Sequence, residues 1–553
     1  MSPTPAATAP LDVLRGALRD AAQAVGGDGH VGDRATLERP KRDDFGDYAT
    51  NVAMLLAPVV GGPPRDIAGK VGEELQARLG PLLDRVEVAG PGFLNLFLSD
   101  AWHTAALTSV LAAGERFGGG GAEQPERLNV EFVSANPTGP LHVGHARNAA
   151  YGDALSRIFA FHGHEVVREY YVNDFGSQIA RLAESVRARA RGEEVAEDGY
   201  QGDYVQAIAN AIPDAATMEL DPLGQKAVAL MTERIRESLH FFGVDFDVWF
   251  SERSLHEPSA SLGGQDPVTH AFATLADLDQ TYAHEDALWL RSGQHGDDKD
   301  RVLVRSSGEH TYFASDIAYM LDKRERGFDR LLYVLGADHH GYRARMAAAY
   351  EALGGDVASL DLLIMQFVHL VERGERSSMS KRSGEFVTLD DLVAEIGVDA
   401  ARWFLLQRSH DTTIDLDLDL AREESAENPV YYVQYAHARI SSVLDKAGAD
   451  RVAAALGAEH AGVALHPAEK ALVKKLLAFP AEIAEAAERR APHRIATYAL
   501  EVAQTFTAFY RDCQVVGAEG EGVEDLRLAV SVAARQTIAT SLGLLGVTAP
   551  ETM

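Results

Sequence analysis

The 553-residue sequence contains a single cysteine, Cys513. One cysteine cannot form an intramolecular disulfide or supply a cysteine-rich zinc site, and it fits a reducing compartment. No uncharged apolar run approaches the roughly 20 residues that a membrane-spanning helix needs. The first residues also lack the basic start and apolar stretch of a secretory signal. We therefore expect a cytoplasmic protein without a membrane partner.

Basic residues are scarce as well, because 52 Lys and Arg stand against 82 Asp and Glu, a formal charge of −30. Affinity for a phosphate backbone comes mostly from Lys and Arg, so the total argues against a nucleic-acid partner. The imbalance is uneven: residues 191–300 hold 7 basic and 22 acidic residues, whereas 1–123 hold 11 and 16, and 428–553 hold 12 and 14. The nearly neutral ends can still offer basic faces, and we expect the acidic surface of 191–300 to face away from RNA.

The composition, 46% hydrophobic and 24% charged, is that of a soluble globular protein, and the length suggests about three to five domains. Residues 1–123 predict a small α/β domain. It has helical spacing over 11–25 and 49–57, and two strands around a Pro-Gly turn in 86–98. The glycine run 118–121 marks its end.

Residues 124–427 predict a Rossmann-like domain built on a parallel sheet. A buried strand at 128–133, a turn-rich stretch and a helix over 143–161 form the opening of a nucleotide-binding α/β unit. We expect the next strand at 163–173. Residues 191–300 look like an insertion, and we expect further strands after it at 302–304, 331–335 and 362–368. Residues 428–553 predict an all-α bundle, with helices over 429–447, 467–489, 492–513 and 525–545.

The first chemical motif is His142-Val143-Gly144-His145, at the start of the predicted helix over 143–161. A helix N-terminus presents free N–H groups and partial positive charge, which suit an anion. Two imidazoles three positions apart can donate to phosphate oxygens. Gly144 leaves room for a flat base against the backbone. The alternative is an ordinary pair of surface histidines, and without an obvious third ligand we predict no metal site.

The second motif is Ser378-Met379-Ser380-Lys381, on a Ser/Gly-rich loop after a buried strand. A mobile loop that carries a lysine can close over a triphosphate and stabilise its charge. The alternative is a solvated basic loop.

Together, the two motifs resemble the HIGH and KMSKS signatures of class I aminoacyl-tRNA synthetases. The surrounding sequences are more specific, and they are similar to arginyl-tRNA synthetases: VEFVSANPTGPLHVGHARNAAYGDAL, YYVNDFGSQI, TYFASDIAY, VLGADHHGY and MSKRSGEFVTLDDLV. The resemblance extends to DDFGDYATNVAMLLA, NPVYYVQYAHARI and LLGVTAPETM, and so covers essentially the whole chain.

The resemblance implies that ATP, supplied with Mg²⁺, and L-arginine react to arginyl-adenylate and pyrophosphate, and that arginine then passes to the terminal adenosine of its tRNA. It implies a monomer, and tRNA-dependent adenylate formation. His142, His145 and Lys381 would stabilise the phosphates, and Gly144, Met379 and Ser380 would also bind ATP. The sequence departs at Ser378, where the signature has its first lysine. Arg376 and Arg382 are candidates for the missing charge.

The resemblance further places arginine on Glu131, Asn136, Tyr312, Asp316 and one residue of 338–340, for which we choose His339. Tyr312 and Asp316 share a face if their segment is helical. A carboxylate such as Asp316 can hold a guanidinium through two hydrogen bonds. A carboxylate in an apolar strand, such as Glu131, needs a partner.

For tRNA, the resemblance assigns the C-terminal bundle to the anticodon and the N-terminal domain to the tRNA elbow. In the bundle Tyr435, Arg439 and Tyr510 have suitable chemistry, because aromatic rings stack on splayed bases and Arg pairs with phosphate. Their alternative is core packing. In the N-terminal domain the candidates are Tyr48 and Asn51.

Two other functions remain at this stage. One is a different nucleotidyl transferase with the first signature, or a synthetase for another amino acid. A small adenylyl transferase would lack the all-α C-terminal third, and a cysteinyl-type relative would need zinc ligands that one cysteine cannot provide. The other is a non-catalytic RNA-binding relative, which we would expect to have lost the signature histidines or Lys381.

Overall fold

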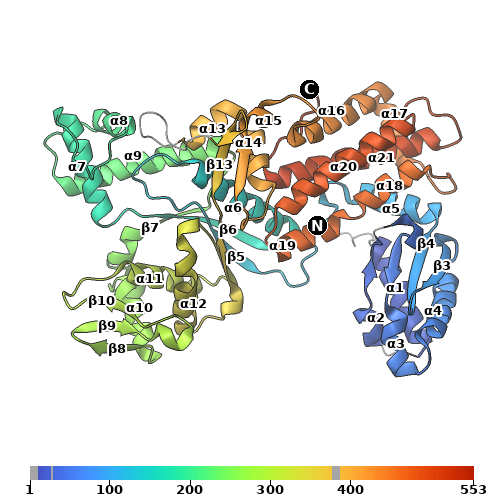
Figure 1. Cartoon of the computed structure of the whole chain (residues 1–553), viewed down its shortest axis with the longest axis horizontal. Helices are drawn as coiled ribbons and strands as arrows, with labels where there is room; N and C mark the ends of the chain where they lie inside the picture. Colours follow the sequence, from blue (N-terminus) through green and yellow to red (C-terminus); the bar gives the residue numbers. More distant parts are fainter. Residues whose placement is uncertain (1–9, 27–28, 41, 377–386) are drawn as a thin grey trace.

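The computed structural model describes residues 10–26, 29–40, 42–376 and 387–553 (Figure 1). The N-terminal part is built on an antiparallel sheet of four strands in the order β1-β2-β4-β3. Its elements are α1 (Pro10–Ala24), α2 (Gly29–Arg34), β1 (Leu37–Glu38), β2 (Tyr48–Thr50), α3 (Val52–Val60), α4 (Pro64–Leu79), β3 (Leu83–Ala89), β4 (Phe93–Leu98) and α5 (Asp100–Ala113). The helix predicted over 49–57 begins only at Val52, because Tyr48–Thr50 pairs with β4.

The central sheet has five strands, all parallel, in the order β12-β11-β5-β6-β7. Its strands are β5 (Arg127–Glu131), β6 (Glu165–Val172), β7 (Val248–Ser251), β11 (Arg330–Leu335) and β12 (Leu360–Ile364). The register aligns Tyr333, Glu131 and Glu169 across three strands. The almost wholly buried helix α6 (Val143–His162) follows β5. The carboxyl ends of all five strands thus meet at one edge, where ligands of such sheets bind.

The predicted single insertion over 191–300 is wrong, because β7 lies inside that range and pairs with β6 in the central sheet. Only four residues long, this strand is too short for a clear sequence signal. The first excursion contains α7 (Ser177–Arg191), α8 (Asp203–Ala211) and α9 (Leu220–Phe241). The second contains α10 (Pro267–Asp277), β8 (Thr281–His284), β9 (Ala287–Leu290) and β10 (Arg301–Val304), and it leads into α11 (Tyr312–Glu325). Residues 302–304 therefore belong to a separate antiparallel sheet, not to the central one.

The strand predicted over 362–368 is also divided. It ends with β12 at Ile364, and β13 (Val368–Glu372) leaves the central sheet to pair with β14 (Glu375–Arg376) and β15 (Ile414–Asp417). The helices of this part are α12 (Arg343–Ala352), α13 (Leu389–Ile396), α14 (Val398–Leu406) and α15 (Leu418–Arg422).

The C-terminal part is the expected helical bundle (Figure 1). Its helices are α16 (Pro429–Ala447), α17 (Ala449–Gly457), α18 (Pro467–Leu476), α19 (Phe479–Glu488), α20 (His493–Asp512) and α21 (Val523–Leu545). The helix predicted over 467–489 breaks before Pro480, since a proline is favoured only in a first turn. Within the described residues, only α21 is long and apolar enough to cross a membrane, but 67% of its most apolar window is buried, as in a core helix.

A buried ion pair joins α14 to α6 within the central domain, and its arginine also reaches the bundle. The side chains of Arg402 and Asp153 are both fully buried and lie 2.5 Å apart. Arg402 also donates to the carbonyl groups of Leu545 and Phe242. Replacing Asp153 by asparagine would leave this guanidinium without its counter-charge, which costs about 3–5 kcal/mol at such a site. We therefore expect D153N to lower the urea midpoint of unfolding markedly.

The matched control is Asp512→Asn, which removes the partner of the exposed Arg511. Exposed pairs contribute about 0–1 kcal/mol, so this variant should unfold near the wild-type midpoint. A D153N protein as stable as D512N would show that the buried pair does not stabilise the packing of α14 on α6.

Candidate active site

The two histidines of the first motif stack at the start of α6, directly beyond β5. Their ring centres are 3.7 Å apart, with an angle of 23° between the planes. Nδ1 of His142 accepts from the N–H of Gly144 (3.0 Å), and Nδ1 of His145 accepts from the N–H of His142 (3.3 Å). Because both Nδ1 atoms are acceptors, a neutral ring carries its proton on Nε2. The helix start therefore offers Nε2–H donors for an anion.

The charge state of His145 follows from its surroundings. Burial and the neighbouring His142 lower the pKa of His145 to about 3. The ring is thus neutral at physiological pH and acts as a hydrogen-bond donor without a titrating charge.

Gly144 is required for a reason that sequence reasoning missed. A Cβ atom at this position would lie 2.8 Å from Cε1 of His142. A side chain would therefore displace the ring that caps the helix. The glycine leaves room for the histidine ring, not only for a flat base as predicted.

The chain that follows the second motif lies beside the first. The N–H of Val143 donates to the carbonyl of Val387 (3.3 Å), and the N–H of Leu389 donates to the carbonyl of Leu141 (2.8 Å). These bonds place Val387 and Leu389 beside the start of α6. The predicted ATP-binding residues Met379, Ser380 and Lys381, together with Ser378 and Arg382, lie outside the described residues. Arg376 is described, and its guanidinium pairs with Asp415 at 3.0 Å.

An acidic pocket of about 160 Å³ opens at the carboxyl edge of β5 and β11. Glu131 at the end of β5 and Asp316 on α11 line it, together with Tyr171, Tyr319, Tyr333 and Tyr342. Glu252, directly after β7, hydrogen-bonds to Tyr171 and lies close enough to Asp316 to raise its own pKa. We use the name acidic pocket for this cavity, lined by Glu131 and Asp316, together with the adjoining carboxylate of Glu252.

Glu131 already has a counter-charge. Its Oε2 accepts from the buried ammonium of Lys323 at 2.6 Å, and its Oε1 accepts from Ser134 at 3.1 Å. The ammonium also lies 4.0 Å from the ring centre of Tyr333 and 4.2 Å from that of Tyr319. Lys323, which the sequence analysis did not single out, therefore fixes the orientation of Glu131 and supplies its counter-charge.

The other two carboxylates carry raised pKa values. Burial raises the pKa of Asp316 to about 6, opposed by the hydroxyl of Tyr342, which donates to it. Burial and the charge of Asp316 raise the pKa of Glu252 to about 7. Two buried acids whose charges disfavour one another suit a cationic ligand, which would stabilise both ionised forms.

The remaining residues predicted to bind arginine are less closely gathered. Asn136 is exposed and lies beside Asn173, which donates to Glu252 at 2.8 Å. Tyr312 starts α11 but is 69% exposed and does not line the pocket. The backbone of His339 lies in a short 3-10 helix after β11, between the pocket residues Gly336 and Tyr342. Sequence reasoning missed Glu252, whose only signal was an acid in a polar stretch.

Tyr435, Arg439 and Tyr510, predicted to contact tRNA, form one exposed cluster on α16 and α20. The guanidinium carbon of Arg439 lies 5.1 Å from the ring centre of Tyr435 and 5.2 Å from that of Tyr510. Tyr435 is 40% exposed and stacks on Tyr431, with ring centres 6.2 Å apart. These rings do not pack the core, so they are open to a splayed base.

Tyr48 and Asn51, predicted to contact tRNA from the N-terminal domain, do not form an exposed cluster of this kind. Tyr48 is only 4% exposed, its hydroxyl accepts from Arg39, and its ring lies edge-on to Trp102. The oxygen of the Asn51 side chain accepts from the N–H of Thr36 at 2.9 Å. The ring of Tyr48 is therefore part of the domain core, and its contact with tRNA stays a prediction.

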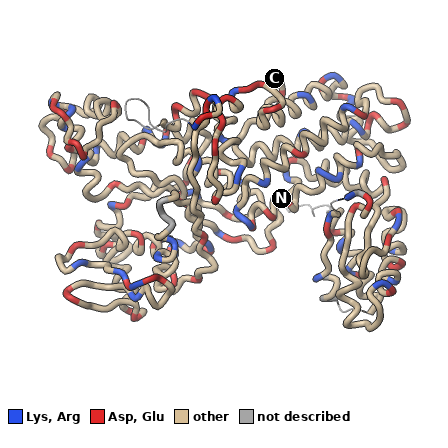
Figure 2. The backbone as a smooth tube through the Cα atoms, viewed as in Figure 1, with Lys and Arg blue, Asp and Glu red and all other residues tan. Residues whose placement is uncertain are grey.

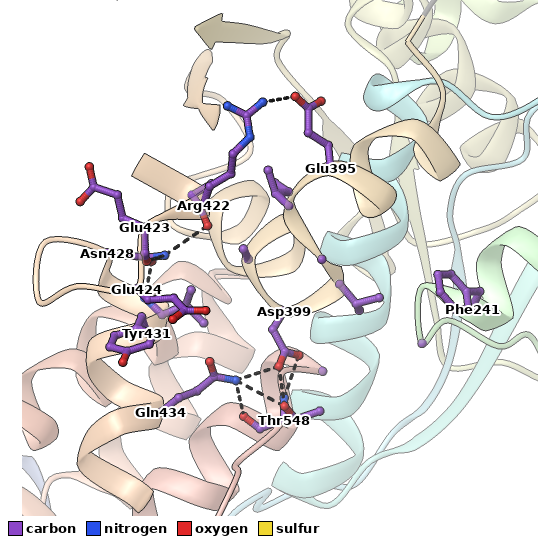
Figure 3. Close-up of a pocket in the computed structure, with 18 residues that line it drawn as sticks. Phe241, Glu395, Asp399, Arg422, Glu423, Glu424, Asn428, Tyr431, Gln434 and Thr548 are labelled. Carbon is purple, nitrogen blue, oxygen red and sulfur yellow. Dashed lines mark hydrogen bonds and ion pairs between the residues drawn. The ribbon is translucent and has the colours of Figure 1, made fainter. Parts of the chain in front are cut away.

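A larger cavity, of about 680 Å³, lies between α9, α14, α15 and α16 (Figure 3). Asp399 accepts from Gln434 (2.7 Å) and from the N–H of Thr548 (3.0 Å) in this cavity, while Arg422 pairs with Glu395. These polar groups bind one another and join α14 to the bundle. The cavity therefore belongs to the junction between domains, and none of the described residues that line it is part of the first motif.

The described residues contain no group of three or more His, Cys, Asp or Glu side chains placed to hold a metal ion. Mg²⁺ usually keeps several waters and binds through substrate phosphates, so it does not require such a cluster. The Nε2–H donors at the start of α6 are compatible with the phosphates of a Mg²⁺–nucleotide complex.

Models of known protein families match most of the chain and identify its class. Residues 106–206 and 244–442, more than half of the chain, match the family model described as tRNA synthetases class I (R), catalytic domain. Residues 12–98 match the arginyl tRNA synthetase N terminal domain, and 433–553 match the DALR anticodon binding domain. The fold and the histidine motif are therefore those of a class I aminoacyl-tRNA synthetase.

Solved structures of arginyl-tRNA synthetases are similar to this chain. A structure from Campylobacter jejuni, assigned as an arginyl-tRNA synthetase, is 34% identical, with a TM-score of 0.75 over 82% of this chain and 100% of that one. The Thermus thermophilus arginyl-tRNA synthetase shares the fold at 24% identity, with a TM-score of 0.73 over 98% and 99% of the two chains. The Plasmodium falciparum enzyme does so at 17% identity and a TM-score of 0.73, over 98% of each.

The chain belongs to the arginyl-tRNA synthetase family. It is an ATP-dependent ligase that activates L-arginine as arginyl-adenylate, with release of pyrophosphate, and then transfers arginine to the 3′-terminal adenosine of its tRNA. Its substrates are arginine, ATP and tRNA, as the sequence motifs predicted.

Proposed function

We propose that the acidic pocket binds the arginine substrate, with Glu131 on the α-ammonium group and Asp316 and Glu252 on the guanidinium. We assign these different roles because the three carboxylates differ in whether they already have a counter-charge. Glu131 is paired with Lys323 and can add one further cation, whereas Asp316 and Glu252 need a shared partner. A guanidinium can bond two carboxylates through its planar N–H groups. Asn136, Tyr312 and His339 act at the margin of this site.

The phosphates of ATP would bind at the start of α6, where the Nε2–H groups of His142 and His145 point away from their own helix bonds. Gly144 keeps the rings in place, and Met379, Ser380 and Lys381 would close over the nucleotide. The attacking nucleophile is the substrate carboxylate, so catalysis consists of positioning and electrostatic stabilisation. Mg²⁺ would enter with ATP and neutralise phosphate charge.

The tRNA would lie along the bundle and the N-terminal domain. The cluster of Tyr435, Arg439 and Tyr510 is a stacking surface for anticodon bases. Tyr48 and Asn51 remain the candidates in the N-terminal domain. We propose domain limits of 1–123, 124–427 and 428–553, a monomeric state and a cytoplasmic location. Acidic positions spread over both excursions from the central sheet (Figure 2), and they would repel misplaced RNA.

Arginine binding should depend on pH. The pKa values of about 6 for Asp316 and about 7 for Glu252 mean that both carboxyls are protonated in the free enzyme at pH 5.5. We expect KM for arginine to be roughly tenfold higher at pH 5.5 than at pH 8. Both pKa values lie above those of the unfolded chain, so the free protein loses stability as pH rises from about 4 to 7. Thermal stabilisation by arginine should accordingly be larger at pH 8.

Steady-state exchange of pyrophosphate into ATP, with tRNA present and arginine varied, measures this dependence. Lysine serves as the control ligand for non-specific effects of pH. An arginine KM that is constant from pH 5.5 to 8 would show that the two raised pKa values do not belong to the arginine site.

A further inference from the structure

Two stacked rings lie at the carboxyl edge of the central sheet, outside the acidic pocket. Phe175 follows β6, and His256 ends the turn after β7. Their ring centres are 4.1 Å apart, with an angle of 13° between the planes. Phe175 is 38% exposed, so one of its faces packs on His256 while part of the ring meets solvent. We call these two residues the stacking pair.

The stacking pair is held in a fixed place. The carboxylate of Asp174 accepts from the hydroxyl of Ser251 (2.6 Å) and from the N–H of Arg253 (2.9 Å). These bonds tie the end of β6 to the end of β7. The rings that follow each strand are thus positioned by the sheet, unlike aromatic side chains on a free loop.

Hydrogen bonds connect the stacking pair with the acidic pocket. Nε2 of His256 lies 3.1 Å from the hydroxyl of Ser315, which in turn bonds to Glu252. Asn173 donates both to Glu252 (2.8 Å) and to the carbonyl of Phe175 (3.3 Å). The exposed ring and the proposed guanidinium ligand therefore belong to one bonded framework.

We propose that the exposed face of Phe175 is a stacking platform for an unpaired nucleotide at the 3′ end of the tRNA. This rests on the proposed assignment of the acidic pocket to arginine. The ester forms on the terminal ribose, so the single-stranded end must run to the mouth of that pocket. Base stacking on an aromatic ring is a usual way to hold single-stranded RNA there.

The charges around the platform agree with this occupant. The guanidinium carbon of Arg253 lies 6.0 Å from the ring centre of Phe175, and its partner Asp221 is 3.6 Å away and largely exposed. Arg253 can therefore turn toward a phosphate beside the stacked base. Burial and the nearby His310 lower the pKa of His256, so the supporting ring stays uncharged.

Fluorescent tRNA tests the platform with the full-length enzyme. One tRNA carries 2-aminopurine in place of the terminal adenosine, and another carries pyrrolo-cytidine at the preceding position, since stacking quenches both probes. We expect that binding of the tRNA to the wild-type enzyme, or to the Phe175→Trp variant, quenches the fluorescence of one of the two probes. Phe175→Ala should lose most of that quenching and raise KM for tRNA roughly tenfold. Phe241→Ala, which truncates a more exposed phenylalanine at the end of α9, should behave as wild type.

Unchanged quenching of both probes by F175A would overturn the proposal. So would an F175A enzyme whose only defect is a raised KM for ATP, because the ring would then hold the adenine of the nucleotide. Asp316→Asn separates the platform from the pocket assignment. If both are right, D316N loses arginine affinity and retains the quenching, whereas a failed pocket assignment leaves arginine affinity intact.

Discussion

Replacing Asp316 by asparagine is expected to lower kcat/KM for arginine by about 10²- to 10³-fold in tRNA-dependent pyrophosphate exchange. Truncating one partner of a buried, hydrogen-bonded charge pair costs about 2–5 kcal/mol. Asparagine has nearly the same shape and can still accept from Tyr342, so the fold should not change. The loss should appear in KM for arginine, while KM for ATP stays close to that of wild type.

Citrulline is the matched probe for this effect, because it replaces the guanidinium by a neutral group of similar shape. If Asp316 faces the guanidinium, the wild-type enzyme discriminates strongly against citrulline and D316N discriminates much less. A variant that loses both substrates in equal proportion would assign Asp316 to the fold of α11 and not to the ligand.

The second large effect is expected at His145. Removing one preorganised donor to a developing charge commonly costs about 10²- to 10³-fold in kcat. We expect His145→Ala to lower kcat of pyrophosphate exchange by this factor, with a smaller change in KM for ATP. Since the pKa of His145 is about 3, the rate between pH 6 and 8 should not follow titration of this ring.

His162→Ala is the control on the same helix. His162 lies in the last turn of α6, nineteen residues and about 25–30 Å from the phosphate end. It should retain nearly wild-type kcat. Equal losses in H145A and H162A would indicate damage to α6, and full activity of H145A would remove the imidazole from the phosphate site.

Much of the fold was predictable, because its signals are local. The helix after β5 carries its own cap: Gly144 leaves room for the capping ring of His142, and Gly163 ends the helix with a left-handed backbone. The bundle helices follow apolar periodicity. In contrast, β7 has only four residues and no such period, so its pairing with β6 could be found only in three dimensions. That one strand changes the predicted insertion into two excursions.

In the candidate active site, too, residues within sequence motifs could be predicted and isolated residues could not. His142, His145, Glu131 and Asp316 stand in sequences with recognisable neighbours, and the structure gathers them at one sheet edge. Glu252 and Lys323 are single charged residues without a motif, and their roles depend on strands and helices that meet from distant parts of the chain. The burial of Tyr48 was not predicted, because an aromatic ring in a polar stretch can still belong to the core of a small domain.

We propose that the acidic pocket recognises arginine by charge. A crystal structure of the enzyme with arginine and tRNA tests it most directly. We expect guanidinium nitrogen atoms within hydrogen-bond distance of both Asp316 and Glu252, and the α-ammonium group on Glu131 beside Lys323. A guanidinium that lies away from both Asp316 and Glu252 would contradict it.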